Sequence, residues 1–345
     1  MTTKIVFLPG DGVGPEVIGA AEAVLAKVSE QEGFSYAAEH HAFGGAAIDS
    51  HGDPFPTETR AACLAADAVI LGAVGGPKWA GGSVRPEQGL LAMRSELGTF
   101  ANLRPATIMP GLEALSPLRP ERVTGCDLLI VRELTGGLYF GDREEGSEAA
   151  LDTCRYSRDE VERIARIAFD AARGRRGKLT SVDKANVLAT SRLWRSVVDD
   201  MATDYPDVTL DHMLVDAAAM RLVSAPTDFD VILTENLFGD ILSDQASAVA
   251  GSIGLAPSAS LGSGKGGIFE PIHGSAPDIA GQGKANPVGT ILSLAMALRH
   301  SLDQEAAAVR IETAVSKALA DGHGTFDLGC SDSTKEMTAA ICERL

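Results

Sequence analysis

Residues 230–244 read Asp-Val-Ile-Leu-Thr-Glu-Asn-Leu-Phe-Gly-Asp-Ile-Leu-Ser-Asp, and they contain the unit from which the predicted fold is built. Residues 231–233 are aliphatic, as is typical of a buried strand. After the turn-like Thr-Glu-Asn, Leu237, Ile241 and Leu242 recur with helical spacing and form an apolar stripe. The stretch therefore predicts a short buried strand that leads directly into a helix.

Asp240 and Asp244 are the two residues of this helix that suggest a function. They are four residues apart near the start of the helix, so they lie on one face, where like charges repel by a few tenths of a kcal/mol. The helix N-terminus compensates part of this repulsion. A divalent Mg²⁺ or Mn²⁺ ion, which favours oxygen ligands, would compensate more. A solvated acidic face is the simpler alternative for such a pair taken alone.

The composition sets limits on the class of protein. A chain of 345 residues, 45% of them hydrophobic, is long enough for a large core and suggests two domains. A net charge of −17 disfavours nucleic acid and anionic membrane as partners. We find no basic, apolar leader and no membrane-length apolar run. Five scattered cysteines without a Cys-x-x-Cys pair predict a reduced, cytoplasmic protein without a zinc site.

Polar residues follow three successive predicted strands. The strands cover residues 179–182, 208–215 and 231–233, and the residues that follow them are Lys184, Asp216, and Asp240 with Asp244. Strands that alternate with helices predict α/β layers with largely parallel strands, and such sheets bind ligands beyond the carboxyl ends of their strands. One lysine and three aspartates therefore gather where a ligand is expected, which favours the metal-site interpretation.

The glycine-rich segment after the first predicted strand does not match a dinucleotide-binding fingerprint. Gly10 and Gly12 are in place, but Pro15 occupies the third glycine position, so a Rossmann fold is rejected. A second match lies within residues 257–267, a Gly/Ser-rich segment that is expected to be a connecting loop. We attribute that match to composition.

Six motifs distributed over the whole chain carry a family resemblance. They are Leu-Pro-Gly-Asp-Gly-Val-Gly-Pro-Glu (8–16), Leu-Gly-Ala-Val-Gly-Gly-Pro-Lys-Trp (71–79), Arg-Pro-Glu-Gln-Gly-Leu-Leu-Ala-Met-Arg (85–94), Val-Arg-Glu-Leu-Thr-Gly-Gly-Leu-Tyr-Phe-Gly (131–141), Asn-Leu-Phe-Gly-Asp-Ile-Leu-Ser-Asp (236–244) and Pro-Ile-His-Gly-Ser-Ala-Pro-Asp-Ile-Ala (271–280). With these motifs the chain resembles the β-decarboxylating dehydrogenases of 2-hydroxy acids. The run at 134–137 resembles the isopropylmalate branch of the family more than the isocitrate branch.

The resemblance implies an isopropylmalate dehydrogenase-like, non-Rossmann α/β fold with two domains around a central cleft. Residues 1–99 with 252–345 would form a discontinuous cofactor-binding domain. Residues 100–251 would form the metal, substrate and dimerisation domain. The family is homodimeric with shared active sites, so Lys184 and Asp216 are expected to serve the neighbouring subunit's site. The apolar residues of the helix at 236–244 would then help to bury the dimer interface.

The resemblance also implies the reaction, which is the NAD-dependent oxidative decarboxylation of 3-isopropylmalate to 4-methyl-2-oxopentanoate and CO₂ in leucine biosynthesis, with Mg²⁺ or Mn²⁺. Lys184 would take the proton of the substrate hydroxyl, and Tyr139 would protonate the enol carbon. The metal ligands would be Asp240, Asp244 and the partner's Asp216, which also contacts the substrate.

Binding residues are carried over in the same way. The substrate carboxylates would be bound by Arg94, Arg104 and Arg132. The isopropyl group would contact Leu90, Leu91 and the partner's Val187, while Glu87 would repel the third carboxylate of isocitrate. The cofactor residues would be His273, Gly274, Ser275, Ala276, Asp278 and Asn286. Pro277 suits the first position of a helix, which would place Asp278 in its first turn, where its carboxylate would bind the ribose hydroxyls and disfavour NADP.

Three alternatives remain. A related dehydrogenase for tartrate, D-malate or homoisocitrate is only partly discriminated by residues 87–94. A magnesium-dependent phosphoryl transferase is disfavoured because the sequence lacks G-x-x-x-x-G-K-[ST]. A non-catalytic binding paralogue would be expected to have lost Lys184, Tyr139 or one of the aspartates, and all of them are present.

Overall fold

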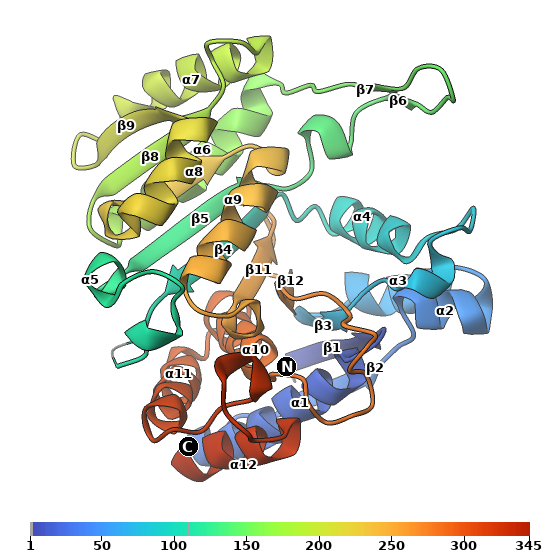
Figure 1. The fold of residues 1–345 in the computed structure, drawn as a ribbon. Coiled ribbons are helices and arrows are strands. Elements are labelled where there is room, and N and C mark those ends of the chain that lie inside the picture. The colour runs from blue at the N-terminus through green and yellow to red at the C-terminus, as the bar shows by residue number, and fades with distance from the viewer. Residues whose placement is uncertain (1–2, 110) are drawn as a thin grey trace. The chain divides into compact units, whose positions relative to one another are not determined.

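The computed structural model describes residues 3–109 and 111–345 (Figure 1). The chain divides into two compact units, one formed by Met1–Thr99 and Ser252–Leu345 and the other by Phe100–Gly251. Each unit combines a sheet with helices, which confirms the predicted mixed α/β class. Within the described residues, no helix has both the length and the hydrophobicity needed to cross a membrane.

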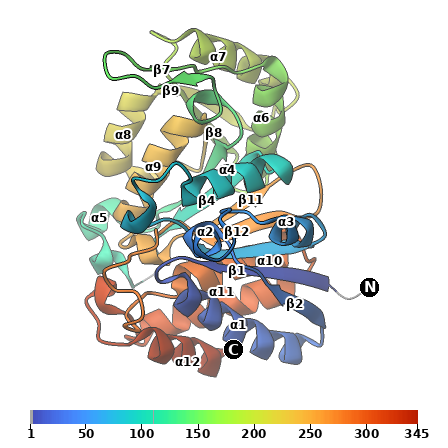
Figure 2. The ribbon, with the colours of Figure 1, turned by 90° about the vertical axis from the view of Figure 1, so that its right-hand side faces the viewer.

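The first unit is built from both ends of the chain around one sheet. Its strands have the order β2-β1-β3-β12-β11, and neighbours are parallel except for the antiparallel pair β11–β12. Helices α1, α10, α11 and α12 pack together on one face, and α2, α3 and α4 cover the other (Figure 2). The strands are β1 (Thr3–Gly10), β2 (Tyr36–His40), β3 (Ala68–Ala73), β11 (Pro257–Leu261) and β12 (Gly267–Pro271). The helices are α1 (Gly14–Glu32), α2 (Gly44–His51), α3 (Thr57–Leu64), α4 (Pro86–Glu96), α10 (Val288–His300), α11 (Glu305–Ala320) and α12 (Thr334–Arg344), with 3₁₀ turns η1 (Pro77–Trp79), η5 (Ile253–Leu255) and η6 (Phe326–Leu328).

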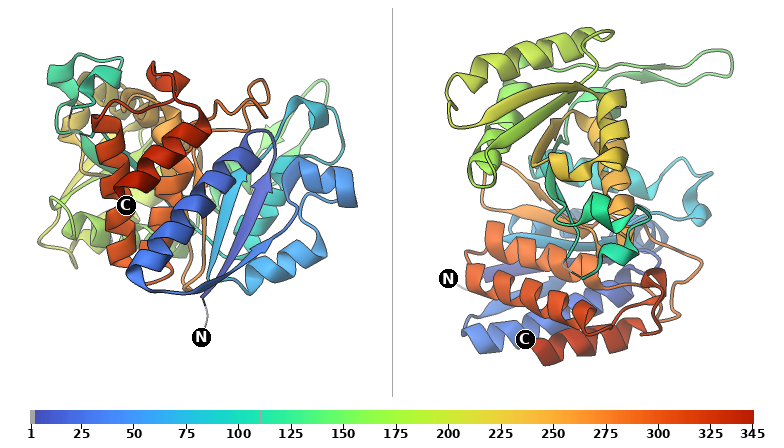
Figure 3. Two further views of the ribbon diagram at one scale, coloured as in Figure 1. Left: turned by 90° about the horizontal axis from the view of Figure 1, so that it is seen from below. Right: turned by 60° about the vertical axis from the view of Figure 1, so that its left-hand side comes forward.

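The second unit has strand order β4-β5-β10-β8-β9, with β4 antiparallel to β5 and the other neighbours parallel. Helices α6 and α7 pack on one face and α8 and α9 on the other (Figure 3). A two-stranded ribbon, β6–β7, projects from this unit (Figure 1). The strands are β4 (Ala101–Thr107), β5 (Asp127–Glu133), β6 (Arg143–Glu144), β7 (Leu151–Asp152), β8 (Lys178–Asp183), β9 (Thr209–Leu214) and β10 (Val231–Thr234). The helices are α5 (Pro120–Val123), α6 (Arg158–Arg173), α7 (Ala189–Ala202), α8 (Val215–Ser224) and α9 (Asn236–Val249), with 3₁₀ turns η2 (Glu113–Leu115), η3 (Gly137–Tyr139) and η4 (Pro226–Asp228).

The strand-to-helix unit predicted at residues 230–244 is confirmed as β10 and α9. The Glu235 side chain caps α9, because its carboxylate accepts hydrogen bonds from the backbone N–H of Phe238 (2.8 Å) and Leu237 (3.2 Å). The residues of the predicted apolar stripe do not all face the core, however. Leu242 is buried in the core of the second unit, whereas Ile241 is 58% exposed. Consecutive helical residues point about 100° apart, so only one of these two can face the core.

The predicted loop at 257–267 is wrong, because its first part is the buried strand β11. Ser258, Ala259 and Ser260 are buried, and the Ser258 backbone N–H donates to the Ser293 hydroxyl of α10 (3.3 Å). At Gly289 of α10, a Cβ atom would lie 3.1 Å from the Ala256 carbonyl oxygen. The small residues that suggested a loop therefore serve the close packing of a strand against a helix.

The predicted helix starting at Pro277 is also wrong. Residues 277–283 form a series of turns, with isolated backbone bonds such as Ile279 N–H to the Ala276 carbonyl (3.1 Å). Gly281 and Gly283 adopt positive φ values of 74° and 64°, and a right-handed helix cannot continue through such residues. Asp278 therefore lies in an exposed turn.

The loop after β1 passes very close to β3, and glycine makes this possible. Gly10 has a φ of 68°, and a Cβ atom there would lie 2.0 Å from the Ala73 carbonyl oxygen. The next residue, Asp11, is buried, and its carboxylate accepts hydrogen bonds from the backbone N–H of Gly45 (2.9 Å), Ala46 (2.8 Å) and Gly75 (2.8 Å). Asp11 thus ties the loop after β1 to the first turn of α2 and to the loop after β3.

We expect Gly10→Ala to lower the free energy of unfolding by more than about 3 kcal/mol, because it adds a backbone clash to the strain of positive φ. Gly33→Ala is the matched control, since Gly33 has a φ of 73° but its Cβ would meet no described atom within 4 Å. That variant should lose only about 1 kcal/mol. Urea unfolding followed by circular dichroism measures both, and equal losses would contradict the role of close approach.

Candidate active site

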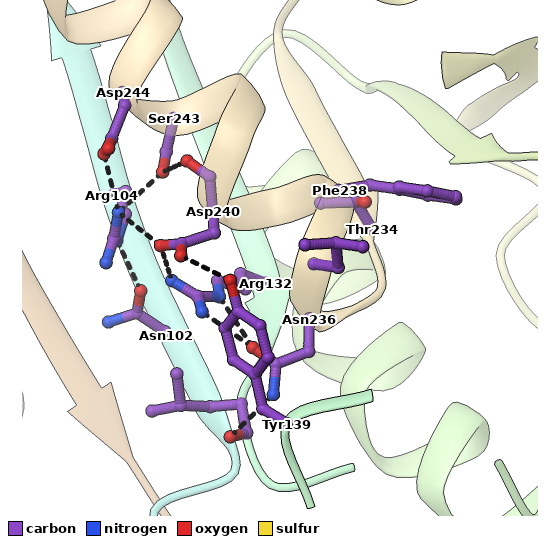
Figure 4. A network of polar contacts seen from close by, with 12 residues as sticks. Asn102, Arg104, Arg132, Tyr139, Thr234, Asn236, Phe238, Asp240, Ser243 and Asp244 are labelled. Atoms are coloured by element: carbon purple, nitrogen blue, oxygen red, sulfur yellow. Dashed lines mark hydrogen bonds and ion pairs between the residues drawn. The ribbon is translucent and has the colours of Figure 1, made fainter. Parts of the chain in front are cut away.

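A polar cluster in the second unit brings together five of the predicted site residues. Arg104 comes from β4, Arg132 from β5, Tyr139 from η3, and Asp240 and Asp244 from α9 (Figure 4). The two arginines lie beside the face of α9 that carries the aspartates, and the tyrosine ring lies over the Arg132 guanidinium, 5.7 Å from it. The cluster joins groups that lie more than a hundred positions apart along the chain.

Arg132 is buried and is held from two sides. Its Nε and Nη2 donate to the Oδ1 atom of Asn236 (3.0 and 2.7 Å), and its Nη1 forms an ion pair with Oδ1 of Asp240. Because Asn236 and Asp240 are four residues apart, they lie on one face of α9 and contact the same guanidinium. The guanidinium of Arg132 is thereby held in one orientation against this face of α9.

Arg104 is held in a similar way one turn further along α9. Its Nε donates to Asn102 Oδ1 (2.6 Å), and its Nη1 donates to the Ser243 hydroxyl (2.7 Å) and to Asp244 Oδ1 (3.3 Å). The same Nη1 lies 3.6 Å from Asp240 Oδ1. The cations that compensate the aspartate pair within this chain are therefore two arginines, in addition to any contribution from the helix N-terminus.

The protonation of the cluster follows from these contacts. Burial alone would raise the pKa of Asp240, but Arg132 and Arg104 outweigh burial and hold that pKa below its ordinary value. The Tyr139 hydroxyl donates to Asp240 Oδ2 (2.9 Å). Burial and the adjacent Asp240 charge raise the pKa of Tyr139 to about 12, so its phenol is protonated at neutral pH. Burial also raises the pKa of Asp244, despite the opposing effect of Arg104.

Lys184 and Asp216 form a separate ion pair in the second unit. Lys184 follows β8, and its ammonium contacts the carboxylate of Asp216 in the first turn of α8. Lys184 lowers the pKa of Asp216, whose side chain is 60% exposed. Among the described residues, no three His, Cys, Asp or Glu side chains are grouped as metal ligands, so Asp216 does not join Asp240 and Asp244 within one chain.

The predicted specificity residues lie mainly on α4 of the first unit. Glu87 is exposed and Leu91 is partly buried, while Leu90 packs against the core beneath the helix. Arg94 is buried and pairs with Glu270 of β12 (2.9 Å). Val187, after β8 of the second unit, is exposed.

A pocket of about 350 Å³ in the first unit gathers most of the predicted cofactor residues. Its lining includes His273, Gly274, Ala276 and Asn286, together with Asp327, which accepts a hydrogen bond from the Asn286 amide (3.0 Å). The His273 Nδ1 lies 2.9 Å from the Gly274 carbonyl oxygen, and its buried Nε2 has no hydrogen-bond partner among the described residues. Burial lowers the pKa of His273, which keeps the ring neutral at pH 7.

The other two predicted cofactor residues do not line this pocket. Ser275 is buried and its backbone carbonyl accepts a hydrogen bond from the Val13 N–H (2.9 Å), which ties the segment to the loop after β1. Asp278 is exposed on the turn that follows. The pocket residue Asp327 was not singled out from the sequence, because a lone aspartate in a loop carries no local signal.

The sequence did not identify three further buried polar residues that hold the site or its neighbouring loops in place. Asn102 and Asn236 are buried beside the two arginines, and Asp11 is buried under the first loop. Asn236 falls within the motif 236–244, and Asp11 within the motif 8–16, but neither has a spacing pattern that predicts its partners. Their contacts arise from strand register and loop packing.

Comparisons with known proteins extend over the whole chain. The family model described as isocitrate/isopropylmalate dehydrogenase matches residues 4–341. Proteins named 3-isopropylmalate dehydrogenase from Staphylococcus aureus and Anaeromyxobacter dehalogenans are 53% and 54% identical, covering 100% of this chain and 99% and 100% of theirs.

Solved structures agree with this match. An isocitrate dehydrogenase from Methylococcus capsulatus has a TM-score of 0.90 at 38% identity, covering 99% of both chains. A beta-decarboxylating dehydrogenase from Thermococcus kodakarensis, in its apo form, has a TM-score of 0.82 at 38% identity, covering 99% of this chain and 96% of the other. The chain therefore belongs to the isocitrate/isopropylmalate dehydrogenase family.

Proposed function

We propose that this protein catalyses the NAD-dependent oxidative decarboxylation of 3-isopropylmalate to 4-methyl-2-oxopentanoate and CO₂, a step of leucine biosynthesis. The observation that carries the proposal is the 53% identity, over the full chain, to proteins named 3-isopropylmalate dehydrogenase. The cluster around Arg132 and Asp240 supplies groups suited to carboxylate binding, metal binding and proton donation.

The substrate is a malate with two carboxylates, which suits the arginines. Arg104 and Arg132 are fixed by buried amides and by carboxylates of α9, so their donors are oriented before the substrate arrives. An oriented guanidinium loses little entropy when it binds a carboxylate, often through two hydrogen bonds. Arg94, which is paired with Glu270, is proposed as the third member of this clamp.

Asp240 and Asp244 fit a divalent metal. Their side chains are 35% and 57% exposed and stand one helical turn apart, so their oxygens remain accessible beside the arginines. Oxygen donors suit Mg²⁺ or Mn²⁺, and a third carboxylate is proposed to come from the partner subunit's Asp216. A bound metal would polarise the substrate hydroxyl as a Lewis acid.

The chain's own acid and base are assigned from their chemistry. Lys184 is proposed to accept the substrate's hydroxyl proton, which requires its amine to lose both its proton and its contact with Asp216. Tyr139 is protonated and lies beside Asp240, so it can deliver a proton to the enol carbon after CO₂ leaves. The hydride from C2 would be accepted by bound NAD⁺.

The pocket of the first unit fits the adenosine part of NAD⁺. Its buried His273 Nε2 lacks a partner among the described residues, which is a cost that a bound polar group can remove. Asn286 offers an amide and Gly274 an open backbone at the same pocket. Asp278, on the exposed turn that follows this segment, is proposed to bind the ribose hydroxyls.

A homodimer with shared sites is proposed from the surface of the second unit. Met220 and Val223 of α8 and Ile241 of α9 are exposed, at 67%, 44% and 58%. Large apolar residues that cluster on two packed helices are typical of a protein interface. An interface there would bring a second copy next to α9, and Lys184 and Asp216 are proposed to complete its site.

The proposed function is tested with purified protein, NAD⁺ and three substrates: 3-isopropylmalate, isocitrate and D-malate. We expect NADH to form with 3-isopropylmalate when Mg²⁺ or Mn²⁺ is present and to stop when the metal is chelated. Each buried CH₂ contributes about 0.8 kcal/mol, and D-malate lacks the isopropyl group. The kcat/KM for 3-isopropylmalate should therefore exceed the kcat/KM for D-malate roughly tenfold or more. Equal or better turnover of isocitrate would overturn the substrate assignment.

For the acid, we expect Tyr139→Phe to lower kcat roughly a hundredfold or more while KM changes by less than about threefold, because only proton transfer is lost. The control is Tyr205→Phe, which removes a phenol bonded to Asp170 outside the cluster. Steady-state kinetics measures both variants. A full kcat in Tyr139→Phe would remove this residue from the mechanism.

For the cofactor, the protein should prefer NAD⁺ to NADP⁺, because the Asp278 carboxylate would repel a 2′-phosphate. Asp278→Asn removes this charge, so the ratio of kcat/KM for NAD⁺ to kcat/KM for NADP⁺ should fall roughly tenfold. The control Asp303→Asn removes an equal charge from an exposed residue outside the segment 273–286, where it pairs with Lys265. Wild-type protein that used both cofactors equally would refute the role of Asp278.

A further inference from the structure

Asn236 is a buried asparagine with an unusually complete set of contacts. Its Oδ1 accepts hydrogen bonds from Nε and Nη2 of Arg132 (3.0 and 2.7 Å). Its Nδ2 donates to the carbonyl oxygens of Leu134 (3.1 Å) and Gly136 (3.0 Å). The amide lies directly against the guanidinium, and the Tyr139 ring is close to both (Figure 4). One side chain therefore joins the start of α9, a buried arginine and the segment that leads to η3.

Strand register explains why Asn236 meets these groups. Thr234, at the end of β10, is the register partner of Arg132 in the neighbouring strand β5. Asn236 follows two residues later as the first residue of α9, so it lies beside Arg132, the penultimate residue of the neighbouring strand. Its own backbone N–H donates to the Tyr156 hydroxyl (3.0 Å), which fixes the helix start.

The neutrality of the amide matters for Arg132. A guanidinium must be held in place to bind a carboxylate well, but a buried carboxylate holding it would cancel its charge. An amide oxygen orients the same donors without adding a negative charge. Arg132 already faces one carboxylate, Asp240, so a second one against the same guanidinium would weaken its attraction for an anion further.

Other arginines of the second unit show the contrast. Arg195 is held by two hydrogen bonds to buried Asp183 (2.8 and 2.9 Å), and Arg175 pairs with buried Asp230 (2.9 Å). Arg104, in the active-site cluster, instead has its Nε bound by the buried amide of Asn102 (2.6 Å). In both cluster arginines the Nε edge is therefore taken by an amide.

We propose that Asn236 is a positioning residue that sets the orientation of Arg132 for the substrate carboxylate without adding a negative charge beside it, and that also anchors the turn before Tyr139. The inference rests on the proposed function only in taking Arg132 as a substrate-binding group. The amide oxygen serves the arginine, and the amide N–H groups serve the turn. The two roles can be separated by substitution.

The first test uses Asn236→Asp, which keeps the shape and the acceptor but adds a negative charge. KM for 3-isopropylmalate should rise roughly tenfold or more, while KM for NAD⁺ stays within about twofold. Asn236→Leu, similar in size but without polar atoms, should raise KM and also lower kcat, because the arginine and the turn are both released. The matched control is Asp230→Asn, the reverse exchange at a buried aspartate that pairs with the partly buried Arg175 outside the cluster. It should lower the thermal midpoint and leave both KM values unchanged.

A purely structural role for Asn236 makes a different forecast. If the role were only structural, both Asn236 variants would lower the thermal midpoint, as the control does. The KM values of the folded protein would then be unchanged. That result would overturn the proposal.

A second measurement does not depend on turnover. Crystal structures of the wild type and Asn236→Leu should show that the Arg132 guanidinium leaves its wild-type position in the variant. An unmoved guanidinium would refute the positioning role, whatever the kinetics. Wild-type protein that failed to oxidise 3-isopropylmalate would instead refute the proposed function and leave this comparison of structures valid.

Discussion

In the second unit, ion pairs between two arginines and two aspartates stabilise charges that would be unfavourable if they were left unpaired. A buried guanidinium is costly unless it is paired, and two carboxylates one helical turn apart repel each other. Arg132 pairs with Asp240, and Arg104 lies within 3.6 Å of both Asp240 and Asp244, so each set of charges stabilises the other. The folded chain thereby holds four charged side chains in one set of ion pairs.

This charge pairing requires α9 to begin at one position relative to β5. Parallel pairing of β10 with β5 fixes the end of one strand beside the end of the other. The Glu235 cap then starts the helix immediately, so a single residue connects the strand to the helix. A shift of one residue in this register would turn Asn236 and Asp240 away from Arg132 by about 100°.

The sequence allowed the strand-to-helix junctions and the need for a cation beside Asp240 and Asp244 to be predicted, because both follow from local spacing. It did not reveal that Arg104 and Arg132 are those cations, since they lie more than a hundred residues away on other strands. Asn236 was missed for the same reason. The family resemblance placed Arg104 and Arg132 in one site with Asp240 and Asp244, and their individual roles stay predictions.

The strand β11 has a consequence for how this chain can change over generations. It belongs to a Gly/Ser-rich segment with the composition of a flexible linker, yet its residues 257–260 are buried and pack against α10. Flexible linkers tolerate nearly any substitution or insertion, whereas larger side chains are costly in a buried strand that packs on α10 and bonds to Ser293. A protein engineer who inserted a tag or a loop there on the basis of composition would disrupt the core of the first unit.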